Sequence, residues 1–82
     1  MNRCRHDIIY NLLASLTAEP KRITDLCSAG NLPVDRGKVL VQNIERFGLL
    51  IKTGGDDDVF YNLTARGYEW IGLYELLRKV LP

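Results

Sequence analysis

The sequence predicts a mostly α-helical (α+β) domain with one small β-hairpin, in the order helix, helix, helix, strand, strand, helix. Apolar residues recur at helical spacing in the first half of the chain. Residues 49–63 are instead rich in β-branched and aromatic side chains around a Gly-Gly pair, which is typical of a hairpin. With 82 residues, the segment 1–82 is expected to form one small domain.

The first two helices are expected over residues 5–17 and 22–30. The first has an apolar stripe made of Ile8, Ile9, Leu12, Leu13 and Leu16. Pro20 prevents it from continuing. In the second helix, Thr24 is the expected N-cap. The pair Gly30-Asn31 supplies left-handed residues that end it.

The third helix is expected over residues 34–47, and Gly48 is its stop signal. One side of this helix is predicted to face the core: Val34, Gly37, Leu40, Val41, Ile44 and Phe47. The other side carries three cations and two amides among Asp35, Arg36, Lys38, Val39, Gln42, Asn43 and Arg46. Gly37 on the inner side allows the helix to approach the core closely.

Two strands, residues 49–52 and 59–63, are joined by the loop Thr53 to Asp58. Gly54 and Gly55 are expected to supply positive φ angles in this loop. Thr64 is placed to cap the last helix, which is expected over residues 65–81.

The segments IERFGLLIKT (44–53) and FYNLTARGYEWI (60–71) resemble small archaeal and archaeal-virus winged helix-turn-helix regulators. They are similar, more loosely, to the wing region of MarR-type and PadR-type repressors. The resemblance implies a sequence-specific regulator of transcription that binds double-stranded DNA as a homodimer. It also implies that the third helix lies in the major groove and that the hairpin is the wing. The sequence departs from this pattern at Asp56-Asp57-Asp58, where relatives often carry lysine or arginine.

A helix in the major groove needs polar or basic side chains that reach base edges. Gln42 and Asn43 can pair with adenine, and Val39 can contact a thymine methyl group. The cations expected to reach guanine or phosphate are Arg36, Lys38 and Arg46. Those expected to contact phosphate from outside this helix are Lys21, Arg22 and Lys52. The alternative for each is an ordinary solvated surface.

The last helix carries more apolar residues than one packing face requires. We expect a homodimer through Trp70, Leu73, Tyr74, Leu77 and Leu81, because an exposed apolar band would promote aggregation. The alternative is that the first helix buries the whole band. The alternative function is a protein–protein interaction module that uses this band and the acidic tip of the wing. If the chain binds DNA, the tip is expected to stay away from the phosphates, which repel it.

Several function classes are not indicated. The formal net charge is +1, so a basic surface requires segregation of charge. Cys4 and His6 are too few for a zinc site, and adjacent aspartates do not match the spacing of an EF-hand. We expect no enzyme activity, cofactor, metal or small-molecule ligand. The chain shows no membrane span and no signal peptide, which predicts a cytoplasmic protein with reduced thiols.

Overall fold

The computed structural model describes residues 5–55 and 57–80. The elements are α1 (Arg5–Ser15), α2 (Ile23–Ala29), α3 (Val34–Arg46), β1 (Leu50–Thr53), β2 (Phe60–Leu63) and α4 (Ala65–Val80). The expected order of helices and strands is therefore confirmed. Asp56 and Leu81 lie outside the described residues, as does Cys4.

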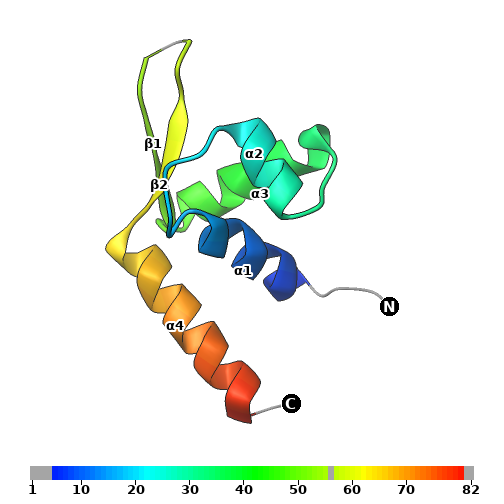
Figure 1. Cartoon of the computed structure of the whole chain (residues 1–82), viewed down its shortest axis with the longest axis vertical. Helices are drawn as coiled ribbons and strands as arrows, with labels where there is room; N and C mark the ends of the chain where they lie inside the picture. The colour runs from blue at the N-terminus through cyan, green and yellow to red at the C-terminus, as the bar shows by residue number, and fades with distance from the viewer. Residues whose placement is uncertain (1–4, 56, 81–82) are drawn as a thin grey trace.

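Helices α1, α2 and α3 form the body of the domain (Figure 1). The hairpin extends from this body at one end, and α4 runs toward the other end, giving a longest extent of 42 Å. The turn between α2 and α3 is closed where Leu32 N–H donates to the Cys27 carbonyl at 2.8 Å. Asn31 has the left-handed conformation there (φ 55°), whereas Gly30 does not (φ −86°), so only half of the expected pair is left-handed.

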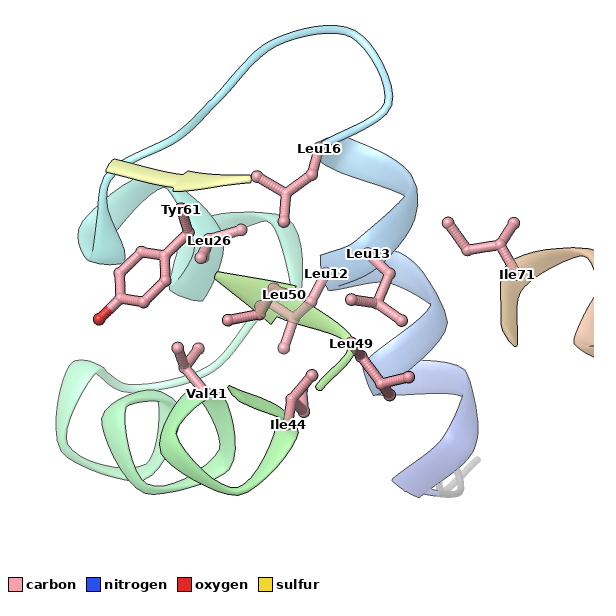
Figure 2. Packing of buried hydrophobic residues seen from close by; sticks show 10 residues of the cluster. All are labelled: Leu12, Leu13, Leu16, Leu26, Val41, Ile44, Leu49, Leu50, Tyr61 and Ile71. Atoms are coloured by element: carbon pink, nitrogen blue, oxygen red, sulfur yellow. The ribbon is translucent and has the colours of Figure 1, made fainter. Parts of the chain in front are cut away.

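The core lies where α1 meets α3 and the first residues of the hairpin (Figure 2). Leu12 and Leu13 of α1 are completely buried, and so is Leu26 of α2. Each such side chain contributes about 1.5–3 kcal/mol through burial. From α4, Ile71 points toward Leu13 (Figure 2). The N-terminal half of α4 is therefore the part of this helix that packs on the body of the domain.

The strands β1 and β2 pair antiparallel, with Leu50 opposite Leu63 and Thr53 opposite Phe60. The backbone of Lys21 adds a short third segment to this sheet. Its N–H and carbonyl pair with Tyr61 at 3.2 Å and 2.8 Å between N and O. In the loop, Gly54 has a positive φ of 104°, but Gly55 is not among the positive-φ residues, so the expectation for Gly55 is wrong.

The caps of the helices differ from one another. Thr64 Oγ1 accepts the Gly67 N–H at 3.0 Å and donates to the Gly48 carbonyl, which confirms Thr64 as the cap of α4. The expectation that Thr24 caps α2 is wrong, since α2 begins at Ile23 and its N-cap is Arg22, without a side-chain cap. The reason is that pairing between Lys21 and Tyr61 holds the chain extended until Arg22.

Two helix ends also differ from expectation. α1 ends at Ser15, and the following residues form a turn in which Leu16 N–H donates to the Leu13 carbonyl at 3.0 Å. Phe47 was expected in the core, but its side chain is 69% exposed. The cause is that α3 ends at Arg46 and the chain turns at Gly48, which adopts φ 81°. Phe47 therefore does not extend the core-facing side of α3.

Candidate nucleic-acid interface

Helix α3 presents two different sides. Gly37, Val41 and Ile44 are buried, as the sequence predicted, whereas Val34 at the first position of the helix is exposed. The opposite side is open to solvent, and its exposed residues are Asp35, Arg36, Lys38, Val39, Gln42 and Arg46. Asn43 is half-buried. The charged and amide-bearing side of α3 is therefore not covered by the described part of the chain.

Helix α2 holds α3 in this orientation through Cys27. A Cβ placed on Gly37 would overlap Cys27 Sγ, so the two helices touch at a point that only glycine permits. Cys27 is buried, and its Sγ lies 4.0 Å from the Val34 carbonyl. Burial raises the pKa of the Cys27 thiol, although the positive charge of Lys38 opposes this shift. The thiol therefore stays neutral and serves as a packing group.

A groove of about 460 Å³ runs between the start of α1 and the outer side of α3. It is lined by Arg5, Asp35, Arg36, Val39, Leu40 and Asn43. Arg36, Val39 and Asn43, three of the residues expected to contact DNA, therefore lie together. Arg5, a cation that the sequence places in a basic N-terminal arm suited to phosphate contacts, also lines this groove. The sequence indicates its charge but not which helix it faces.

A second groove, of about 420 Å³, lies between the wing and the start of α2. Its lining brings Arg22 and Lys52 together, and they share it with Ile23, Thr24, Asp57, Val59 and Tyr61. The two cations belong to segments 30 residues apart in sequence, and the pairing of Lys21 with Tyr61 brings these segments together. Asp57 in the same lining makes this part of the surface mixed in charge.

Two of the expected phosphate contacts already have carboxylate neighbours. Arg22 Nη2 lies 2.8 Å from Asp58 Oδ1, and Lys21 Nζ lies 3.4 Å from Glu19 Oε1. The Arg22 guanidinium also lies over the Phe60 ring, 5.0 Å from its centroid. Acidic groups therefore interrupt the cationic surface between the wing and the start of α2, while α3 carries Arg36, Lys38 and Arg46 on its open side.

Helix α4 has an uncovered apolar side. Leu73, Leu76, Leu77 and Val80 are 60%, 59%, 52% and 67% exposed. The alternative that α1 buries the whole band is therefore wrong. Leu76 and Val80 were not included in the predicted interface, although their apolar character and spacing place them beside Leu73 and Leu77 on the helix. Leu81, which was included, lies outside the described residues.

Trp70 and Tyr74 lie between α4 and α1 and are half-buried. The Tyr74 ring is 5.1 Å from Tyr10 and 5.3 Å from Trp70, and Trp70 stacks against His6 at 6.4 Å between centroids. With Leu73 and Leu77, the side chains of His6, Trp70 and Tyr74 line an apolar groove of about 380 Å³. The predicted interface residues therefore include two exposed leucines and two aromatics that also join the helices.

A polar contact links α1 to α4 as well. Tyr10 Oη donates a hydrogen bond to Glu75 Oε2 at 2.7 Å, and the Arg78 guanidinium lies 5.7 Å from the centroid of the Tyr10 ring. The hydrogen bond to Glu75 raises the pKa of the Tyr10 phenol, with a further contribution from desolvation.

Among residues 5–55 and 57–80, none of the helices combines the length and the apolar character that crossing a membrane requires. The same residues contain no group of three or more histidine, cysteine, aspartate or glutamate side chains arranged to hold a metal ion.

The helix-turn-helix of α2 and α3, the hairpin that follows it and the final helix define a winged helix-turn-helix fold. Solved structures confirm this fold. The chain is similar to Sso10a-2, a DNA-binding protein from Sulfolobus solfataricus, with a TM-score of 0.82 and 17% identity over 95% of this chain and 81% of that one. It is similar to a MarR family protein from Bacillus stearothermophilus, with a TM-score of 0.72 and 21% identity over 88% of this chain and 54% of that one.

A third similar structure is the homodimeric winged helix-turn-helix DNA-binding domain Mb0332 from Mycobacterium bovis, a possible ArsR-family transcriptional regulator. Its TM-score is 0.70 at 13% identity, over 93% of this chain and 68% of that one. No protein-family model and no curated protein sequence matches the chain. The expected resemblance to winged-helix regulators is thus confirmed in the fold.

Proposed function

We propose that this protein is a transcriptional regulator that binds double-stranded DNA as a homodimer, with α3 in the major groove. The observation that carries the proposal is the open outer side of α3 within a winged helix-turn-helix fold. Two of the solved structures described above, Sso10a-2 and Mb0332, are a DNA-binding protein and a DNA-binding domain by their own descriptions.

The chemistry of α3 suits the reading of bases. Gln42 is exposed and Asn43 lines the groove beside Arg36, so an amide and a guanidinium are available for adenine and guanine edges. Val39, which is 59% exposed, is an apolar side chain suited to a thymine methyl group. Because Gly37, Val41 and Ile44 fix the inner side, these outer groups are held on a rigid element.

Cations around α3 would contribute contacts to the phosphates. Arg46 and Lys38 are exposed on the helix itself, and Arg5 adds a charge from α1. Lys52 is exposed on β1, where a wing can lie along the sugar-phosphate backbone of DNA. Such contacts position a protein on the duplex without reading its sequence.

The proposal of a homodimer is based on the uncovered apolar side of α4. Four apolar side chains on this helix are at least half exposed, and a second copy of the same helix would cover them. A symmetric pair would also present two α3 helices to successive turns of one duplex.

A second function, binding to another protein, is favoured by one observation. Asp57 and the Arg22–Asp58 pair give the wing groove a mixed charge, which suits a protein surface better than it suits a phosphate backbone. In that case α4 would meet a different protein in place of a second copy.

Fluorescence anisotropy with a mixed-sequence duplex, repeated over a series of salt concentrations, separates the two functions. DNA binding through phosphates should weaken by about 0.9 log units per tenfold increase in salt for each phosphate that is neutralised. We expect binding at low salt with a steep salt dependence. A chain that binds no duplex at low salt, although it is folded by circular dichroism, would contradict the proposed function and favour protein binding.

A further inference from the structure

Arg22 is held between an aromatic ring and a carboxylate, both from the wing. Its guanidinium lies over Phe60 at 5.0 Å from the centroid, and its Nη2 donates to Asp58 Oδ1 at 2.8 Å. Both partners of the ion pair remain open to solvent, with side chains 53% and 71% exposed. A ligand from solution can therefore reach either group.

The two charged groups are attached to the fold differently. Arg22 follows Lys21, whose backbone pairs with Tyr61, so the stem of Arg22 is fixed beside the sheet. Asp58 belongs to the loop between β1 and β2, beyond the last ladder pair of Thr53 and Phe60. If the pair separates, the loop rather than the arginine is the part that can move.

A carboxylate and a phosphate compete for the same groups on arginine. The guanidinium offers N–H donors in a planar fork that fits the oxygens of either anion. Asp58 therefore sits on Arg22 where an oxygen of a DNA phosphate would be held. The surrounding surface also carries Lys52 and Asp57, so Arg22 is part of the groove that the wing would bring to DNA.

We propose that Asp58 is a built-in competitor for the phosphate contact of Arg22, so that it weakens binding to the DNA backbone. The proposal rests on the proposed DNA binding and deepens it by giving the acidic wing a role. The carboxylate holds the guanidinium in the free protein, and a duplex gains this contact only by displacing Asp58. The wing thus reduces the sequence-independent part of the affinity, which is mainly electrostatic.

The test compares Asp58→Ala with Asp57→Ala on a mixed-sequence duplex. Each variant removes one negative charge from the same loop, so long-range repulsion falls by a similar amount in both. Only Asp58→Ala also frees Arg22. We expect Asp58→Ala to bind about two- to fivefold more tightly than Asp57→Ala, the range that corresponds to an exposed ion pair.

The double variant Arg22→Ala/Asp58→Ala completes the design, and it should lose the gain that Asp58→Ala has over Asp57→Ala. Equal affinities of the two single variants, or a gain that persists without Arg22, would overturn the role of Asp58 while DNA binding itself stands. Weaker binding by Asp58→Ala would also overturn it, since the pair would then be supporting the wing on DNA. If neither the original protein nor any variant binds duplex at low salt, the proposed function fails and the competitor role fails with it. Thermal unfolding of each variant shows whether it is folded.

Discussion

Gly37 of α3 lies directly against Cys27 of α2, and a Cβ at position 37 would overlap the cysteine sulfur. This contact sets the distance between the two helices of the helix-turn-helix. It also fixes which side of α3 faces solvent, because Val41 and Ile44 then point into the core with Gly37. The orientation of the candidate DNA-reading side chains follows from this packing.

Gly37→Ala should therefore destabilise the protein. Alanine favours a helix over glycine by about 1 kcal/mol, but overpacking of this kind costs about 1–3 kcal/mol. We expect a net loss of stability in urea unfolding, and partial recovery when Cys27→Ala removes the sulfur from the same variant. The matched control is Gly72→Ala in α4, where a Cβ meets nothing within 4 Å and should stabilise the protein. Equal effects of the two glycine substitutions would contradict the contact.

Thr64→Ala should lower stability by about 0.5–2 kcal/mol, because it removes the cap of α4. The hydroxyl accepts from the Gly67 N–H and donates to the Gly48 carbonyl, so it ties the start of α4 to the end of α3. Thr64→Ser keeps the hydroxyl and should lose much less. The free energy of unfolding from denaturant titration distinguishes the two variants, and similar losses for both would argue against the cap.

The contact between α1 and α4 should weaken at alkaline pH. The hydrogen bond to Glu75 raises the pKa of the Tyr10 phenol above its ordinary value of 10.0 in the folded protein. The folded state therefore keeps this proton to higher pH than the unfolded state. The stabilisation is fully present below the unfolded pKa and is lost as the pH rises through the folded one.

Denaturant titrations near neutral pH and at about pH 11, followed by the fluorescence of Trp70, measure this loss. Because Tyr10 is partly open to solvent, we expect a contribution below about 1 kcal/mol. Tyr10→Phe lacks the ionisable group and should lose less stability between the two pH values. If the original protein and Tyr10→Phe change equally, the Tyr10–Glu75 bond does not contribute to the pH dependence.

Leu73→Glu should convert the proposed homodimer into a monomer, since it places a charge on the uncovered apolar side of α4. Tyr68→Glu is the control, because Tyr68 is 53% exposed on the same helix but lies about 140° around its axis from Leu73. Sedimentation equilibrium would show the difference in mass. A monomeric unmodified protein would contradict the homodimer. If both variants stay dimeric, another surface must be responsible for assembly.

Arg46→Ala should weaken binding to a preferred duplex by about 1–3 kcal/mol if Arg46 contacts a base. The comparison is Lys79→Ala, which removes the same charge from the last turn of α4, far from α3 in the fold (Figure 1). Anisotropy titrations of both variants at one salt concentration give the result. Equal losses would mean that Arg46 acts through overall charge alone.

Local sequence patterns determine the order of the helices and strands in this protein. The apolar stripes of the first and third helices, the Gly-Gly pair between two β-type runs and Thr64 before the last helix predicted the order of elements and a confirmed cap. These signals work because helical and strand periodicity and capping depend on neighbours within a few residues. The polar side of α3 could be predicted for the same reason.

Contacts between distant segments were decided only by the tertiary structure. The pairing of Lys21 with Tyr61 moved the start of α2 to Ile23, and the turn at Gly48 left Phe47 in solvent. The same pairing brings Arg22 to the wing, where Asp58 holds it. No spacing in the sequence indicates these contacts, because they depend on how the helices and strands pack against one another.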